Sequence, residues 1–219
     1  MIQPSDFNLI QLYVPAEKRA AFAALFAVND AMGDVLRSTS DPMVGRIRLA
    51  WWRERLEELD RNAVPAEPRL AEAARLLLPA GISGADLAEL ETGWTHLLEP
   101  FPWPDLSGEA TWFRGMRLFG FGARLLDRSD EQIQAAGGLW ALVDAARHCS
   151  DAPSRDMLID RARHFAKAVA GKRFARPLRP LSMLAALALR DLGRWPAIEP
   201  EGTPGRALTL VRHRLTGRL

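Results

Sequence analysis

Apolar residues recur along most of this chain at intervals of three and four positions, and no useful length alternates between apolar and polar residues. A spacing of three and four positions places apolar side chains on one face of an α-helix, whereas alternation of apolar and polar residues would indicate a β-strand. Proline, glycine and capping residues separate the helical stretches, among them residues 15–37, 42–61, 83–98, 107–127 and 130–150. The pattern predicts an all-α fold, a bundle of about eight helices joined by mostly short loops.

The composition agrees with a single helical domain. Ala, Leu and Arg dominate, Ile is sparse and Tyr occurs once, so good helix formers outnumber β-branched residues. With 219 residues and 48% hydrophobic content, the chain is long enough for one sizeable core and short for two. We therefore expect one domain over residues 1–219.

Cysteine usage, the N-terminus and the apolar runs bear on localisation. Cys149 is the single cysteine, so no disulfide forms within the chain, and a reducing compartment fits. Residues 1–6 show neither the basic nor the apolar region of a signal peptide. No apolar run approaches the roughly 20 residues of a membrane span. These features predict a cytoplasmic protein.

Charge is distributed unevenly, although the net charge is only +2. Residues 1–149 carry 15 basic and 21 acidic residues, whereas residues 150–219 carry 14 basic and 6 acidic residues. The basic C-terminal part is either a solvated arginine-rich surface or a peripheral contact with the anionic inner face of a membrane. Basic and aromatic residues are not interleaved as in nucleic-acid grooves, so no nucleic-acid partner is expected.

The apolar face of the helix predicted over residues 15–37 contains polar positions. On a helical wheel, Asn29 and Gly33 fall in the middle of this face, Asp30 lies at its edge and Asp34 lies further round. A buried amide without partners costs roughly 1–3 kcal/mol, so Asn29 needs hydrogen-bond partners. The face therefore either packs closely on a neighbouring helix or borders a cavity.

In the helix predicted over residues 42–61, two adjoining apolar stripes cover a wide arc. So wide an arc is typical of a helix at the centre of a fold. Trp51 and Trp52 are then expected as core residues. Arg48 lies near both tryptophans and is expected either to stack on one of them or to extend into solvent.

Ionisable residues continue the apolar face of the helix predicted over residues 130–150. Trp140 lies on this face, and Asp144, Arg147 and, one turn on, Asp151 follow it. Such groups are costly on an apolar stripe unless they are paired or border water. They form either an Asp144–Arg147 ion pair near the helix end or the wall of a polar cavity.

Other chemistry has little support in the sequence. One cysteine and four scattered histidines do not form a zinc site, and the chain lacks a Walker A run, a dinucleotide-binding glycine loop and a Gly-x-Ser-x-Gly motif. His148 is expected either as a base beside an aspartate or as a helix C-terminal histidine favoured by the helix dipole.

Three segments together resemble the squalene/phytoene synthase family. They read Arg19-x-x-x-x-x-Leu25-Phe26-Ala27, Asp41-Pro42-x-x-Gly45-x-Ile47-Arg48-Leu49-x-Trp51-Trp52-Arg53 and Gly138-x-Trp140-x-Leu142-Val143-Asp144-x-x-Arg147. The resemblance implies an isoprenoid-synthase-like bundle around a central cavity and a prenyltransferase of isoprenoid biosynthesis. In that family, two Asp-x-x-x-Asp motifs on facing helices hold Mg²⁺ against a prenyl diphosphate.

The family's acidic motifs are degraded in this chain. Where the family carries acids, this sequence has Gly33, Arg37, His96, His148 and Ala152. Divalent cations facing Arg37 and His148 would be repelled rather than bound. A literal Asp30-x-x-x-Asp34 occurs three residues early, off the centre of the inward face. The chain also resembles the family's mitochondrial branch, which is implicated in assembly of respiratory complex I.

The resulting hypothesis is a squalene/phytoene synthase-like pseudoenzyme with no catalytic residue, no metal ligand and no cofactor. It would bind an isoprenoid diphosphate, a lipid or a protein partner. The candidate residues facing the cavity are Asn29, Asp30, Gly33, Asp34, Arg48, Trp52, Trp140, Asp144, Arg147, His148 and Asp151.

Two alternatives remain open from the sequence. The first is an active Mg²⁺-dependent prenyltransferase that joins prenyl diphosphates head to head with the relocated aspartates Asp30, Asp34, Asp144 and Asp151. The second is a scaffold or assembly protein with a filled core, which predicts that no cavity exists.

Overall fold

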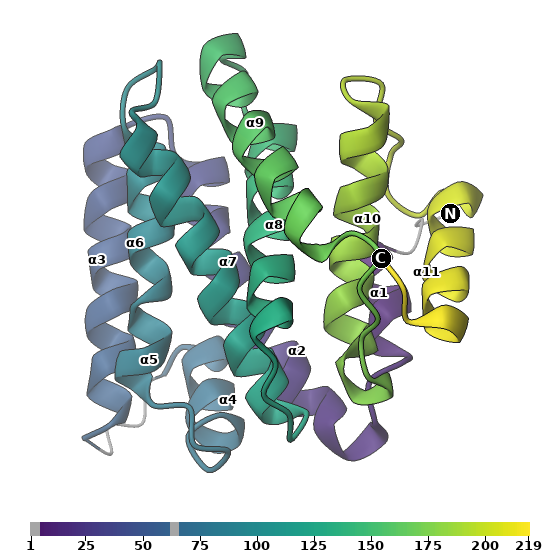
Figure 1. The fold of residues 1–219 in the computed structure, drawn as a ribbon. Helices are drawn as coiled ribbons and strands as arrows, with labels where there is room; N and C mark the ends of the chain where they lie inside the picture. The colour runs from purple at the N-terminus through teal and green to yellow at the C-terminus, as the bar shows by residue number, and fades with distance from the viewer. Residues whose placement is uncertain (1–4, 62–65) are drawn as a thin grey trace.

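The computed structural model describes residues 5–61 and 66–219, and helices dominate both ranges (Figure 1). In chain order the elements are α1 (Asp6–Gln11), α2 (Ala16–Ser38), α3 (Pro42–Leu59), α4 (Pro68–Leu76), α5 (Gly84–Ala88), α6 (Leu90–Thr95), η1 (His96–Leu98), α7 (Asp105–Leu125), α8 (Glu131–His148), α9 (Ala152–Val169), η2 (Arg176–Leu178), α10 (Arg179–Arg194) and α11 (Pro204–Thr216). No β-strand occurs in the described ranges, so the predicted all-α fold is confirmed. None of the helices described combines the length and apolar composition that a membrane crossing requires.

The predicted helices are present, with differences at three places. The short helix α1 was not expected. The stretch predicted as one helix over residues 83–98 divides into α5, α6 and η1, with Glu89 between α5 and α6 keeping right-handed helical backbone angles. α7 begins at Asp105, two residues before the predicted start at 107.

The long helices stand side by side, with α3 at one edge of the bundle and α11 at the other (Figure 1). α7 packs extensively on α8, and α8 packs on α9 and α10. α2 lies behind this row and contacts α3, α4 and α7. This order brings α2, α8 and α10 together around the middle of the molecule.

The expected central position of α3 is wrong. Trp52 is in the core with 7% of its surface exposed, but Trp51 is 41% exposed and Ile47 is 64% exposed. Because α3 forms an edge of the bundle, only the stripe through Leu49, Trp52 and Leu56 has neighbours to pack on. The second apolar stripe faces solvent.

The crossing of α7 and α8 depends on two glycines that face each other. A methyl group added at Gly115 would overlap the backbone carbonyl oxygen of Gly137, and one added at Gly137 would overlap that of Gly115. The two backbones are therefore in direct contact, and no side chain fits between them. This contact fixes the distance between the two helices that carry Arg114 and Trp140.

We expect Gly115→Ala to destabilise the fold by about 1–3 kcal/mol, because the added methyl would force α7 and α8 apart. The matched control is Gly120→Ala in the same helix, where the nearest atom to the new methyl is 3.8 Å away. That change should stabilise the fold by up to about 1 kcal/mol through helix propensity. Urea denaturation measures both variants, and a stabilised Gly115→Ala would contradict the close crossing.

Candidate functional site

A cavity of about 450 Å³ lies between α1, α2, α8, α10 and the first turn of α11. One part of its wall is apolar and is made by Phe7, Phe26, Trp140, Val143, Leu184, Leu187 and Ala188. The rest is ionisable or polar and is made by Ser5, Asp6, Asn8, Asp30, Arg37, Asp144, Arg147, His148, Asp191, Glu201 and Arg206. The cavity thus offers an apolar surface and a charged one side by side.

Aromatic rings build the apolar part of the wall. Phe26 lies 4.8 Å from Phe7 and 6.2 Å from Trp140, measured between ring centroids. Trp140 in turn stacks on Phe119, with the centroids 5.6 Å apart. These contacts join α1, α2, α7 and α8, so the wall is a continuation of the core.

A chain of buried ion pairs forms the opposite side. Asp191 on α10 accepts hydrogen bonds from Arg147 on α8 (2.5 Å) and from Arg206 on α11. Arg206 also donates from Nε to Asp6 on α1 (2.6 Å). Asp6, Asp191 and Arg206 are each less than 5% exposed. These charges satisfy one another, and they tie four helices together at the cavity.

The predicted alternative of an Asp144–Arg147 ion pair is wrong. Arg147 points to Asp191, 44 residues further along the chain. Asp144 lies beside His148, whose Nδ1 is 3.8 Å from Asp144 Oδ1 and 2.8 Å from the Asp144 carbonyl oxygen. The Asp144 carboxylate is thus left half-buried in the cavity wall.

On α2, Asn29 has the partners that its burial requires. Its Oδ1 accepts a hydrogen bond from Arg114 Nη1 (2.8 Å), and its Nδ2 donates to Asp30 Oδ1 (3.3 Å). Asp30 lies at the cavity mouth, where desolvation, together with the nearby charge of Asp144, raises the pKa of its carboxyl to about 6. Asn29 therefore connects Asp30 to a buried arginine.

Arg114 on α7 is that buried arginine, and the sequence analysis did not identify it. It is 2% exposed, and its guanidinium carbon lies 3.8 Å from the centre of the Trp94 ring. Its Nε and Nη2 atoms have no hydrogen-bond partner among the described residues. Burial lowers the pKa of Arg114 to about 10, an effect that Asp144 and Asp30 oppose. The guanidinium is therefore a cation held beneath the two cavity aspartates.

Of the predicted site residues, the structure brings Asp30, Trp140, Asp144, Arg147 and His148 together in the cavity wall. Gly33 does not border the cavity, because it packs against Trp94, whose nearest ring carbon would lie 3.0 Å from an added methyl. Asp34 points to the outside and pairs with Arg37 (2.7 Å) and Arg69 (3.4 Å).

Three further predicted residues lie outside the cavity wall. Trp52 is a core residue of α3. Arg48 is exposed and donates to Ser38 Oγ (3.0 Å). Asp151 caps α9 by accepting hydrogen bonds from Ser154 N (2.9 Å) and Ser154 Oγ (2.6 Å), which lower the pKa of its carboxyl.

The sequence also contains a signal for Asp191. Leu184, Leu187, Ala188 and Asp191 follow one face of α10, so an acid continues an apolar stripe there as Asp144 does on α8. Arg206 gives a weaker signal, because α11 is rich in arginine and only one of these side chains turns inward to Asp191.

The donor set does not fit the Mg²⁺ cluster that the family resemblance implies. Asp30 and Asp144 are separate carboxylates on facing helices, and Asp6 and Asp191 are already bound to arginines. Arg37 and His148, which the resemblance places where the family carries acids, line the same cavity. Within the residues described, no group of three His, Cys, Asp or Glu side chains is arranged to hold a metal ion.

The family comparison bears on the first part of the chain. The family model described as squalene/phytoene synthase matches residues 3–107. No curated protein and no solved structure matches the chain. The match confirms the resemblance to this family, and it includes α2 but not α8, α10 or α11. The resemblance to the mitochondrial branch stays a prediction.

We expect Asp191→Asn to destabilise the fold by about 3–5 kcal/mol, because it leaves the buried Arg147 and Arg206 without their shared countercharge. The matched control is Asp160→Asn, which removes an exposed partner of Arg163 and should change stability little. Urea denaturation of both variants measures the difference. Equal, small effects would show that the buried network does not hold the four helices together.

Proposed function

Given that the chain is squalene/phytoene synthase-like over residues 3–107, we propose that it is a homologue without metal-dependent prenyl transfer. It binds an isoprenoid or similar lipid with a polar head in the cavity between α2, α8 and α10. The observation that carries the proposal is the pair of cationic or cation-forming side chains, Arg37 and His148, at the cavity mouth.

Charge supports the loss of metal chemistry. Several Mg²⁺ ions and a diphosphate require a dense set of carboxylates. The carboxylates of this cavity that lie outside arginine ion pairs are Asp30, Asp144 and Glu201, and they share the site with Arg37, His148 and the nearby Arg114 guanidinium. Repulsion between Arg37 and a divalent cation opposes binding at the position of the first motif. Arg37 binds Asp34 through Nη2 (2.7 Å), and the remaining N–H groups of its guanidinium can donate to an anionic head group.

The shape of the cavity supports an amphiphilic ligand. Its volume of about 450 Å³ lies within the roughly 300–1,000 Å³ of small-molecule sites. An apolar chain would pack against Phe26, Trp140 and Leu184, where burial of each CH₂ contributes about 0.8 kcal/mol. The polar head would then lie near Arg37 and His148.

One observation favours an active prenyltransferase as a second candidate. Asp30 and Asp144 lie on facing helices and are close enough that the charge of Asp144 raises the pKa of Asp30. In this reading, the two carboxylates share one cation. Asp34 and Asp151 take no part, since the first pairs with Arg37 and the second caps α9.

Incubation of the full chain with farnesyl or geranylgeranyl diphosphate and Mg²⁺ separates the two candidates. We expect no release of diphosphate above a protein-free control, because the cations at the mouth oppose the metal cluster. Turnover of about 1 s⁻¹ or more, a typical enzyme rate, would overturn the proposal. If turnover occurs, Asp30→Asn and Asp144→Asn should abolish it and the surface control Asp160→Asn should not.

A further inference from the structure

The last helix, α11, carries apolar side chains on two opposite faces. Its inner face contains Leu210 and His213, which are no more than 2% exposed. Its outer face carries Leu208, Val211 and Leu215, which are 68%, 44% and 73% exposed. The spacing of three and four residues aligns these three side chains in one stripe on the side away from the bundle. The helix therefore presents an apolar surface that nothing in the described chain covers.

Basic side chains gather at the C-terminal end of this helix. Residues 171–174 run beside residues 217–219, with hydrogen bonds from Gly171 N to Leu219 O (2.8 Å) and from Phe174 N to Gly217 O (2.8 Å). Arg173 also donates to the Thr216 carbonyl oxygen, and Arg179 donates to that of Arg214. The resulting basic cluster consists of Lys172, Arg173, Arg176, Arg179, Arg212, Arg214 and Arg218.

These seven cations lack carboxylate partners. Across residues 5–61 and 66–219, none of them forms an ion pair, and α11 itself contains no acid. Arg176 and Arg173 repel the Arg179 guanidinium and, after desolvation, contribute to the lowering of its pKa. Gathering like charges without neutralisation is unfavourable in the isolated protein. The cluster is therefore suited to an anionic partner.

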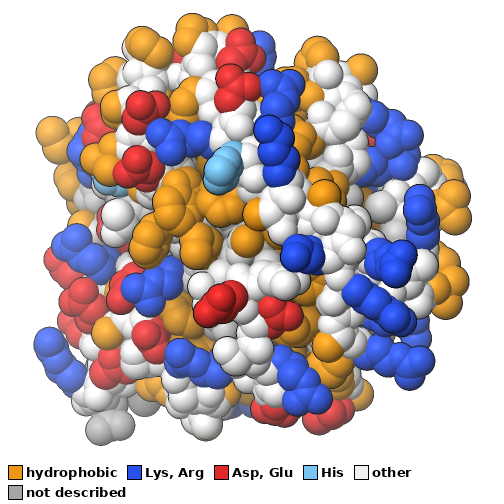
Figure 2. All heavy atoms as spheres, viewed as in Figure 1, with side chains coloured by type: hydrophobic (Ala, Val, Ile, Leu, Met, Phe, Trp, Pro, Cys, Tyr) orange, Lys and Arg blue, Asp and Glu red, His pale blue; other side chains and the backbone are white. Residues whose placement is uncertain are grey.

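We propose that the outer face of α11 and the basic cluster dock together onto an anionic lipid membrane. A helix with an apolar stripe flanked by arginines lies in the plane of the membrane interface, with its apolar side chains among the acyl chains and its cations among the phosphates. Figure 2 shows blue and orange side chains together along the right edge of the molecule, where α11 lies in Figure 1.

The combination of charge and apolar stripe selects lipid over other anionic partners. A nucleic acid would use the arginines but would leave Leu208 and Leu215 in water. An acidic protein surface would need its own apolar groove to cover them. A groove of about 710 Å³ between α10 and α11, lined by Arg194, Arg212 and Arg218, adds space for a lipid phosphate beside the stripe.

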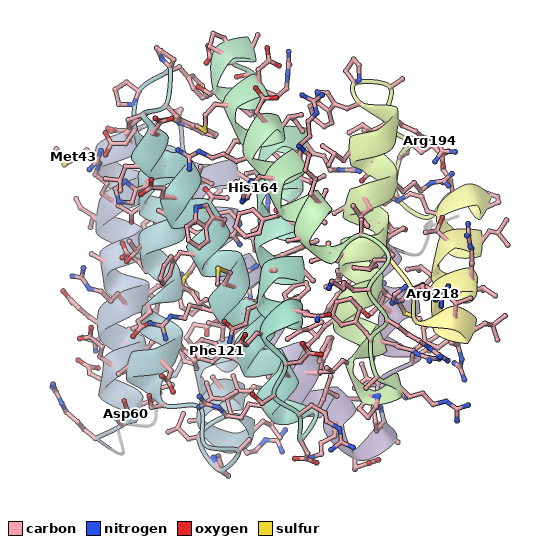
Figure 3. The ribbon with its side chains drawn as sticks, viewed as in Figure 1. Met43, Asp60, Phe121, His164, Arg194 and Arg218 are labelled. Atoms are coloured by element: carbon pink, nitrogen blue, oxygen red, sulfur yellow. The ribbon has the colours of Figure 1, made fainter. Side chains whose placement is uncertain are left out.

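Docking in this orientation is independent of the cavity ligand but places the cavity near the bilayer. Arg206 on the inner face of α11 lines the cavity, and Leu208 lies two residues later on the outer face. Figure 3 labels Arg194 and Arg218 on this side of the molecule, whereas Met43 on α3 lies at the opposite side. The two ends of the bundle can therefore be tested separately.

Flotation of the full chain with lipid vesicles tests the proposal. We expect binding to vesicles of phosphatidylcholine mixed with phosphatidylglycerol, weaker binding at high salt, and little binding to phosphatidylcholine alone. Leu208→Gln/Leu215→Gln should weaken binding at least tenfold, because two buried side chains are lost. Arg212→Gln/Arg218→Gln should weaken it roughly fivefold for each charge removed.

Matched controls lie on α3 and directly after it, at the other edge of the bundle. Met43→Gln/Ile47→Gln removes two equally exposed apolar side chains, and Arg53→Gln/Arg61→Gln removes two exposed cations; both should leave vesicle binding unchanged. All substituted positions are exposed, so thermal unfolding should remain that of the parent chain.

The proposal is wrong if anionic vesicles do not bind, if the control variants weaken binding equally, or if an oligonucleotide at equal phosphate concentration displaces the protein from the vesicles. It is also wrong if the α11 variants only convert a dimer to a monomer in light scattering.

Discussion

The cavity depends on the ion pairs that the buried Asp191 carboxylate makes. Its carboxylate binds Arg147 and Arg206, and Arg206 continues to Asp6, so one buried chain of charges joins α8, α10, α11 and α1. Asp6, Asp191 and Arg206 are buried and Arg147 is partly buried. Burying charges is costly unless each has its partner in place, so these helices have little freedom to shift. The arrangement keeps a charged wall facing the aromatic wall of Phe26 and Trp140, and the cavity is the space between them.

The charged side chains that line the cavity are typical of a binding site rather than of a metal centre. Three carboxylates of its wall, Asp30, Asp144 and Glu201, form no ion pair with an arginine among the described residues. Asp30 and Asp144 lie near the buried Arg114, and Arg37 and His148 line the same cavity. Arg37 thus places positive charge in the same cavity wall as Asp30 and Asp144.

The periodicity of apolar residues predicted those features that depend on neighbours within one helix. It gave the helices, the inward position of Asn29 and the ionisable end of α8, where Asp144, Arg147 and His148 do line the cavity. The periodicity did not predict contacts in which the partner residue comes from a distant segment of the chain. Trp51 was expected in the core because a wheel shows a stripe but not whether another helix covers it. Asp144 was one of two expected environments for Arg147, because Asp191, 44 residues away, cannot be seen in the local pattern. Arg114 was missed for the same reason, since Asn29 and Trp94 reach it from other helices.

The central claim is that the cavity binds an isoprenoid-type ligand without a metal cluster. Calorimetric titration of the full chain with an unreactive prenyl thiodiphosphate, once with Mg²⁺ and once with a chelator, tests it most directly. The account predicts binding with the same affinity in both conditions, because Arg37 and His148 rather than metal ions face the head group. Failure to bind in either condition, or a loss of about tenfold or more when Mg²⁺ is removed, would contradict it.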